Sequence, residues 1–282
     1  MGKIKIYCRS FSPELYRLSS ELYPDGIEAV RLTNKTADGY FYSMLEDSEC
    51  DIAINIDEDA VVTDWDGVMK LARKVEAEGY ANAGTPDCGP GCPRYHNPII
   101  TNPFFNILNL KLIRSKYPGA REVSGFNYLS VTKQMDDAFP KELAGRVRGD
   151  FGKYDFEPYY PFFCWLAYNF KTLYLDAERH SANGDTLSTI LLNHEGTPIC
   201  LHAWMSRKFK VEKGHTRRIY ALADEAYALQ GKVRQKITLK DKIRFAAELA
   251  VRYPVKAVSR ITRWPSKLRR KIDRKRLGQV SG

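Results

Sequence analysis

The stretch Cys50-Asp51-Ile52-Ala53-Ile54-Asn55-Ile56-Asp57-Glu58-Asp59-Ala60-Val61-Val62 decides the fold of this chain. Its apolar run, from Ile52 to Ile56, predicts a buried strand, because the run is too short for a helix of normal length. Three carboxylates follow directly at the end of that strand. So much negative charge beside a core is costly unless a cation neutralises it.

Side chains alternate between the two faces of a strand, which predicts that Asp57 and Asp59 point the same way and Glu58 the other. Two carboxylates on one side are hard oxygen ligands that suit Mg²⁺ or Mn²⁺, and such an ion can also hold the phosphates of a substrate. The alternative interpretation is an acidic turn after a strand, since Asp is common in turns.

Charge is distributed unevenly along the 282 residues. Residues 232–282 hold 17 Lys and Arg against 3 Asp and Glu, whereas the remainder of the chain is mildly acidic. No uncharged apolar stretch reaches the ~20 residues that span a bilayer, and the N-terminus lacks the apolar region of a signal peptide. The six scattered cysteines are consistent with reduced thiols. These observations predict a cytosolic protein with a globular body and a basic tail.

The residues before Asp57 predict a β-α-β-α-β succession and therefore a parallel sheet with right-handed crossovers. Arg9 follows the first strand, at the sheet edge where open α/β folds bind ligands; a solvated strand-end arginine is the alternative. Neither a Gly-x-Gly-x-x-Gly loop nor a Walker loop is present, which disfavours dinucleotide oxidoreductases and P-loop enzymes. Further along the chain, a helix is expected around 187–192.

The sequence Asn55-Ile56-Asp57-Glu58-Asp59, followed by an apolar pair and a helix over 64–79, resembles the nucleotide-sugar half of GT-A glycosyltransferases of the family-2 type. The resemblance covers roughly residues 3 to 207. It implies an α/β fold with a mostly parallel Rossmann-type sheet flanked by helices, over 1–215. The change in composition from Thr216 onward predicts a helical basic extension over 216–282. In that family the two acids hold a divalent cation that bridges the diphosphate of the sugar donor, so Mn²⁺ or Mg²⁺ is the expected cofactor.

Further site residues come partly from position and partly from the resemblance. Asp87 lies in a loop rich in Gly and Pro and is a candidate for sugar hydroxyls. His202 follows the whole predicted sheet, where many GT-A enzymes carry a third metal ligand and then a mobile basic segment, although a lone histidine is more often structural. The residues expected to bind the donor are Arg9, Asn34, Asp57, Asp87 and Arg207, and those expected to bind metal are Asp57, Asp59 and His202.

A catalytic base is expected just before Pro158, where the sequence predicts the start of a helix. Inverting GT-A enzymes commonly place a carboxylate at such a helix start, where it takes a proton from the acceptor hydroxyl. Glu157 is the first choice and Asp155 the second. Ordinary helix capping is the alternative role for either acid.

The basic tail combines its charge with an apolar stripe. Leu239, Ile243, Ala246 and Ala250 recur at helical spacing, with Lys and Arg on the other face. A basic amphipathic helix of this kind predicts association with an anionic membrane surface through 232–276. A solvated tail or a helix packed on the domain are the alternatives, and nucleic acid is disfavoured because the apolar stripe would then lack a partner.

The function expected from these features is that of a metal-dependent hexosyltransferase at the inner face of the membrane. It would move a sugar from a nucleotide-diphosphate donor to a saccharide or lipid-linked acceptor, as in bacterial surface polysaccharide and glycolipid synthesis. A nucleotidyltransferase would share the acidic site, although Arg9-Ser10-Phe11-Ser12 is not its usual Gly-rich phosphate loop. A non-catalytic membrane or nucleic-acid adaptor, acting through the tail, is the remaining alternative.

Overall fold

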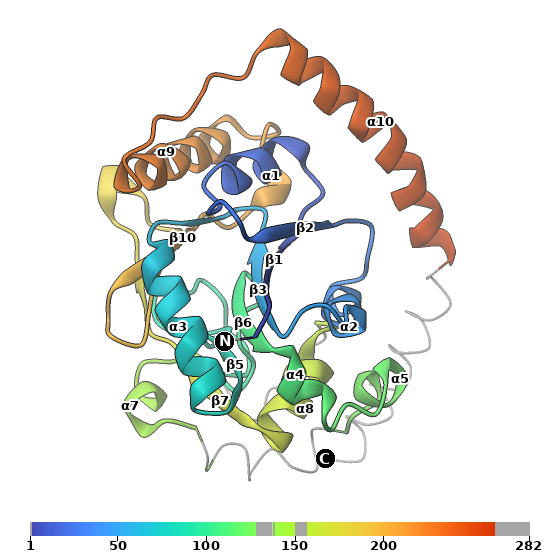
Figure 1. The fold of residues 1–282 in the computed structure, drawn as a ribbon. Coiled ribbons are helices and arrows are strands. Elements are labelled where there is room, and N and C mark those ends of the chain that lie inside the picture. The colour runs from blue at the N-terminus through green and yellow to red at the C-terminus, as the bar shows by residue number, and fades with distance from the viewer. Residues whose placement is uncertain (1, 128–136, 138, 150–156, 263–282) are drawn as a thin grey trace. The chain divides into compact units, whose positions relative to one another are not determined.

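The computed structural model describes residues 2–127, 137, 139–149 and 157–262. The chain divides into two compact units, Met1–Gln235 and Lys236–Gly282, which are described separately. The first unit combines strands with flanking helices (Figure 1), so the predicted α/β class is confirmed.

A six-stranded mixed sheet forms the centre of the first unit. Its strands, in spatial order, are β2 Glu28–Leu32, β1 Ile4–Arg9, β3 Ile52–Asp57, β6 Phe105–Asn109, β5 Tyr80–Gly84 and β7 Lys171–Tyr174. β1 pairs in parallel with β2 and β3, as the β-α-β-α-β succession predicts. β6 runs antiparallel to both of its neighbours, which the sequence did not predict.

A second, antiparallel sheet of four strands lies beside the first. In spatial order its strands are β4 Ala60–Val62, β10 Pro198–His202, β9 Thr189–Leu192 and β8 Ala177–Arg179. The prediction of a helix around 187–192 is therefore wrong, because β9 pairs with β10 on one side and β8 on the other. The chain passes from the first sheet to the second between β3 and β4, which is at the acidic stretch.

Helices flank the two sheets of the first unit. They are α1 Pro13–Ser20, α2 Gly39–Glu46, α3 Trp65–Ala77, α4 Leu110–Arg114, α5 Ala120–Ser124, α7 Lys141–Ala144, α8 Tyr160–Asn169 and α9 Lys213–Leu229, with short 3-10 turns at η2 Ala182–Gly184 and η3 Ser206–Lys208. The start of α3 follows from its sequence, because the Asp64 side chain accepts a hydrogen bond from Gly67 N at 3.0 Å.

Strand β3 distributes its side chains between two hydrophobic cores. Ile52, Ile54 and Ile56 pack with the apolar side of α3 on one face of the sheet. Ala53 points to the other face, where α2 and α8 supply a cluster rich in aromatic side chains. Figure 1 shows α3 apart from α2, α4 and α8 accordingly. Both faces of β3 are thus covered, which explains why its sequence is almost continuously apolar.

Helix α9 belongs to the first unit. Its buried residues Ile219, Leu222 and Ala226 pack in one cluster with Leu15 of α1 and Leu201 of β10. The predicted boundary at residue 216 therefore lies inside α9, a helix whose apolar side is buried in the first unit. The division between the two compact units falls instead after Gln235.

The second unit contains helix α10, Leu239–Thr262. Thr238 and Asp241 cap its start reciprocally, with Asp241 N donating to Thr238 Oγ1 at 3.2 Å and Thr238 N donating to Asp241 Oδ2 at 3.0 Å. Across the residues that can be described, no helix has both the length and the apolarity to cross a membrane.

Gly91 lies where the loop that follows β5 packs against β8. Its φ is +73°, and an added Cβ would overlap the backbone of Glu178, the central residue of β8. Gly196 also has a positive φ, +81°, but nothing lies within 4 Å of an added Cβ there. We expect Gly196→Ala to lower the free energy of unfolding by about 1 kcal/mol through backbone strain, and Gly91→Ala by about 3 kcal/mol because steric overlap adds to that strain. Urea unfolding of both variants measures this; equal losses would contradict the packing of the loop against β8.

Candidate functional site

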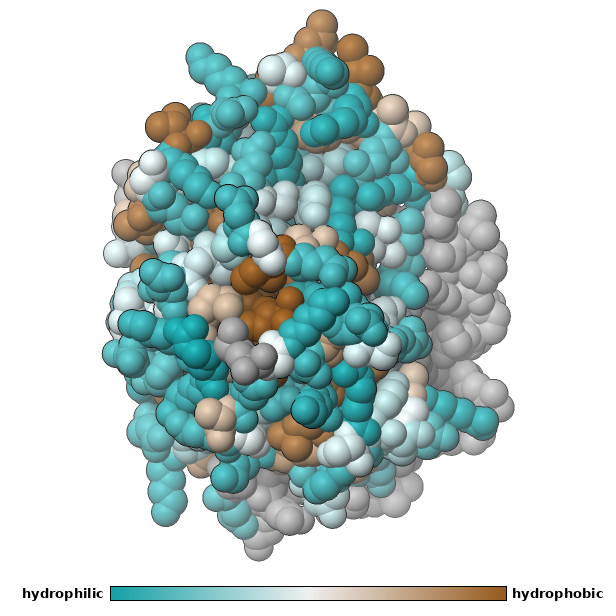
Figure 2. Space-filling model, in the orientation of Figure 1, coloured by the Kyte–Doolittle hydropathy of each residue, from teal (hydrophilic) through white to brown (hydrophobic). Residues whose placement is uncertain are grey.

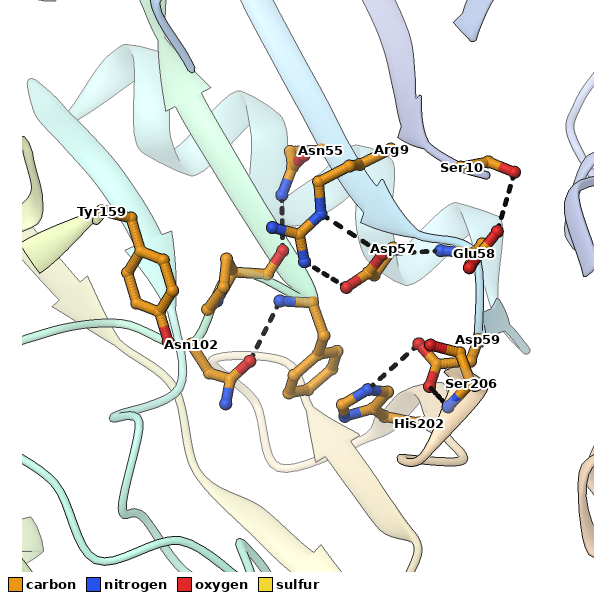
Figure 3. A network of polar contacts seen from close by, with 12 residues as sticks. Arg9, Ser10, Asn55, Asp57, Glu58, Asp59, Asn102, Tyr159, His202 and Ser206 are labelled. Atoms are coloured by element: carbon orange, nitrogen blue, oxygen red, sulfur yellow. Dashed lines mark hydrogen bonds and ion pairs between the residues drawn. The ribbon is translucent and has the colours of Figure 1, made fainter. Parts of the chain in front are cut away.

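The acidic stretch does not continue as one strand. β3 ends at Asp57 and β4 begins at Ala60, with Glu58 and Asp59 forming the turn between them. The prediction that strand alternation places Asp57 and Asp59 on one side is therefore wrong. Each of the three carboxylates turns to a different partner, as Figure 3 shows.

Asp57 pairs with Arg9. The guanidinium reaches both carboxylate oxygens, through an Nη2–Oδ2 contact and an Nε–Oδ1 distance of 3.4 Å. The pairing follows from the sheet, because Arg9 and Asp57 are register partners at the ends of the adjacent parallel strands β1 and β3. The Arg9 guanidinium also lies 5.4 Å from the centre of the Tyr40 ring.

Glu58 binds the loop between β1 and α1. Its Oε2 accepts hydrogen bonds from Ser10 Oγ at 3.0 Å, Phe11 N at 2.8 Å and Ser12 N at 2.6 Å. Burial, with the nearby charges of Asp57 and Asp59, raises the pKa of Glu58 to about 7. Glu58 therefore holds the first loop of the fold in place rather than facing a ligand.

Asp59 faces His202, although the two residues are far apart in the sequence. The antiparallel pairing of β4 with β10 puts His202 opposite Ala60, and His202 Nε2 lies 3.4 Å from Asp59 Oδ1. Ser206 N donates to the other carboxylate oxygen at 3.1 Å. Burial alone would raise the pKa of Asp59, but the adjacent His202 and the hydrogen bond from Ser206 N hold it below its usual range.

The position of His202 is fixed by packing and by the turn that follows it. Its ring stacks on Phe104 with a centroid distance of 4.2 Å and an interplanar angle of 15°. In the turn that follows, Trp204 and Met205 have φ values of +58° and +62°, a backbone conformation that residues other than glycine rarely adopt. Arg218 supports this turn by donating to the carbonyl oxygens of residues 203 and 204. The strained turn and the histidine are thus held by α9.

The Asp59–His202 pair has the donor atoms of a divalent-cation site. Carboxylate oxygen and imidazole nitrogen both bind first-row divalent ions such as Mn²⁺. Their 3.4 Å separation exceeds a normal hydrogen bond, and it is close to the roughly 3 Å between adjacent ligands of an octahedral ion with bonds of about 2.1 Å. In addition, His202 Nδ1 is buried without a hydrogen-bond partner among the described residues.

Of the three metal ligands predicted from the sequence, the structure brings Asp59 and His202 together and directs Asp57 to Arg9. In the portion of the chain with described coordinates, no three His, Cys, Asp or Glu side chains converge as a metal-binding cluster. A cation held by this pair would need its remaining ligands from a substrate, such as a diphosphate, or from water.

A second polar cluster surrounds Asp87, after β5. The Asp87 side chain is fully buried, and it accepts hydrogen bonds from Tyr159 Oη at 3.0 Å and from Asn102 Nδ2. Arg94 Nη1 lies 3.4 Å from Asp87 Oδ2. A buried carboxylate with these partners does not present itself to sugar hydroxyls. Asp87 instead anchors Arg94 and Tyr159.

Arg94 connects this cluster to the candidate base. Its Nη1 donates to Tyr159 Oη at 2.8 Å and lies 3.9 Å from Glu157 Oε1. The guanidinium also lies 5.3 Å from the centre of the Trp204 ring, close to His202. The side chains of Arg94 and Glu157 remain 33% and 27% exposed, so both can be reached by a substrate.

Helix α8 begins at Tyr160, two residues later than the sequence predicted. Glu157 therefore precedes the helix, and its contribution to the helix start is its carbonyl oxygen, which accepts from Tyr160 N at 3.0 Å. The N-cap residue of α8 is Tyr159, so the capping alternative does not describe Glu157. Asp155 lies outside the described residues.

The two remaining predicted donor-binding residues lie after β2 and in the 3-10 helix η3. Asn34 follows β2 with a left-handed φ of +58°, and Arg207 is exposed in η3, next to Ser206. The sequence interpretation did not include Arg94 or Tyr159. One signal was available for Arg94, because it is the lone Lys or Arg between Lys74 and Lys111.

Comparison of the chain with protein-family models, with curated proteins and with solved structures finds no match. The functional assignment therefore rests on the residues of this chain and their geometry.

Asp87 predicts a specific pH dependence of stability. Burial raises its pKa to about 6, against the opposing effect of Arg94. Since the folded pKa lies above the unfolded value, the folded state binds the proton more tightly, and the free energy of unfolding falls as the pH rises from about 4 to 6. We expect the difference in unfolding free energy between wild type and Asp87→Asn to change by about 3 kcal/mol across that range.

Urea unfolding at several pH values between 4 and 7 measures this difference. Glu142→Gln, an exposed acid changed in the same way, is the matched control and should show no such change. If the difference in unfolding free energy between wild type and Asp87→Asn does not change with pH, that result would contradict the buried position of Asp87.

Proposed function

We propose that this chain is a metal-dependent glycosyltransferase of the GT-A type, which moves a sugar from a nucleotide-diphosphate donor to a saccharide or lipid-linked acceptor. The observation that carries the proposal is the juxtaposition of Asp59 and His202 beside the carboxyl end of β3. Open α/β sheets bind ligands outside the carboxyl ends of their strands. An acid from the Asp-x-Asp stretch and a histidine from β10 meet at such an edge.

On the donor side, Asp59 and His202 would hold Mn²⁺ or Mg²⁺, with Asp57 as the neighbouring carboxylate. A bound cation of this kind offsets the negative charge that develops on a leaving diphosphate. Arg9, at the end of β1, and the exposed Arg207 supply further positive charge for the diphosphate. Asn34, in the loop after β2, is the residue we assign to the nucleoside.

On the acceptor side, Glu157 is the residue we assign as general base. Its accessible carboxylate would take the proton of an acceptor hydroxyl as that oxygen attacks the anomeric carbon, which is the pathway of an inverting transferase. Arg94 contacts Glu157 and is itself held by Asp87 and Tyr159. This chain of contacts would fix the base relative to the Trp204–His202 side of the site.

The contacts of the first loop favour a glycosyltransferase over a nucleotidyltransferase. A nucleotidyltransferase would use backbone N–H groups of the loop after β1 to cradle phosphates. Here Phe11 N and Ser12 N already donate to Glu58. The positive charges at this edge are instead carried by side chains, namely Arg9, which is paired with Asp57, and the exposed Arg207.

Ligand-dependent melting of the full chain tests the proposal. A ligand that binds the folded state increases the free energy of unfolding, by about 2.7 kcal/mol at a ligand concentration 100-fold above the Kd. For a domain of this size, that increase raises the melting temperature by several degrees. We expect such a shift with one nucleoside diphosphate of a panel, and only when Mn²⁺ is present. Asp59→Asn and His202→Ala should each lose the Mn²⁺-dependent part of the shift.

Asp66→Asn is the matched control, because Asp66 is an exposed acid on α3 and its loss should leave the shift unchanged. Circular dichroism verifies that each variant is folded. The proposal fails if no nucleotide stabilises folded wild type, or if both site variants keep the full Mn²⁺-dependent shift.

A further inference from the structure

Helix α10 presents an exposed apolar face. Ile243 and Val251 are 63% and 71% exposed, and Leu239, at the start of the helix, is 74% exposed. Ala246, Ala247 and Ala250, also exposed, lie between them at the i, i+3, i+4 and i+7 spacing that forms one side of a helix. Figure 2 shows hydrophobic residues interspersed with hydrophilic ones over α10.

Basic side chains border this face. Lys240 and Arg244 follow Leu239 and Ile243 by one position, and Lys242 precedes Ile243, so cations flank the apolar residues on both sides. The three are exposed. The acids of the helix lie away from the face and are engaged, with Asp241 in the N-terminal cap and Glu248 paired with Arg252 at 2.7 Å.

We propose that this face of α10 docks on the surface of an anionic lipid bilayer. An apolar strip flanked by lysine and arginine matches the boundary between acyl chains and negatively charged headgroups, because the strip can enter the acyl region while the cations stay among the headgroups. Charge disfavours a second copy of the chain as the occupant, since two such basic borders would repel each other. Nucleic acid would pair with the cations but leave Leu239, Ile243 and Val251 in water.

Vesicle flotation of the full chain tests this surface. We expect at least 10-fold more protein bound to vesicles containing roughly a third phosphatidylglycerol than to pure phosphatidylcholine, with binding weakened by salt. Ile243→Glu/Val251→Glu should lower binding to the anionic vesicles by about 10-fold or more, because it places charge in the apolar strip. Both positions are exposed, so the fold should keep its melting temperature.

Val211→Glu/Val233→Glu makes the same charge change at two residues of the first unit that are 78% and 89% exposed. This control should bind vesicles like wild type. The proposal is overturned if wild type does not prefer the anionic vesicles, or if Ile243→Glu/Val251→Glu binds them as well as wild type does.

Two further results would assign the face to another occupant and also overturn the proposal. One is a dimer in sedimentation velocity that Ile243→Glu/Val251→Glu converts to a monomer, without vesicle binding by wild type. The other is a gel shift with duplex DNA that this variant abolishes, again without vesicle binding. Neither result bears on nucleotide binding by the first unit, so this surface and the proposed transferase site stand or fall separately.

Discussion

Three consecutive carboxylates at the end of a buried strand are the constraint on which the arrangement of this fold depends. Each is compensated by a different part of the chain. Arg9, from the adjacent strand β1, pairs with Asp57, and the amides of the first loop bind Glu58. Asp59 faces His202, which the pairing of β4 with the late strand β10 brings beside it. The contacts of the acidic stretch therefore connect the two sheets, and they link strand β1, near the N-terminus, with strand β10.

Packing and hydrogen bonds hold the candidate site around Asp59. His202 is stacked on Phe104, and the left-handed turn after it is held by Arg218 of α9. Backbone strain of this kind persists only where the surroundings determine it fully, and it concentrates at functional sites. Helix α9 is thus part of the support of the site.

The early part of the fold could be predicted because its signals are local. The apolar run of β3, the cap at Asp64 and the parallel pairing of the first strands follow from short patterns. The antiparallel β6 and the whole second sheet depend on pairings between distant segments, which no local pattern specifies. For that reason the sequence predicts a helix where β9 lies, since a short apolar run does not distinguish a helix from a strand.

The site shows the same division. The sequence predicted Asp59, His202 and Glu157 as candidate site residues, but it did not show that Asp57 would face Arg9 or that Asp87 would be buried. Arg94 was missed because its partners, Asp87 and Glu157, belong to loops that meet only in the folded chain. A single arginine in a long segment without other Lys or Arg was the signal that could have found it.

The most direct test of the central claim is anomalous diffraction at the manganese edge, from crystals of the full chain grown with Mn²⁺ and a nucleoside diphosphate. We expect an anomalous peak at bonding distance, about 2.2 Å, from both a carboxylate oxygen of Asp59 and Nε2 of His202, with diphosphate oxygens completing the site. A manganese peak elsewhere, with the Asp59–His202 contact unchanged and no nucleotide at the end of β3, would contradict it.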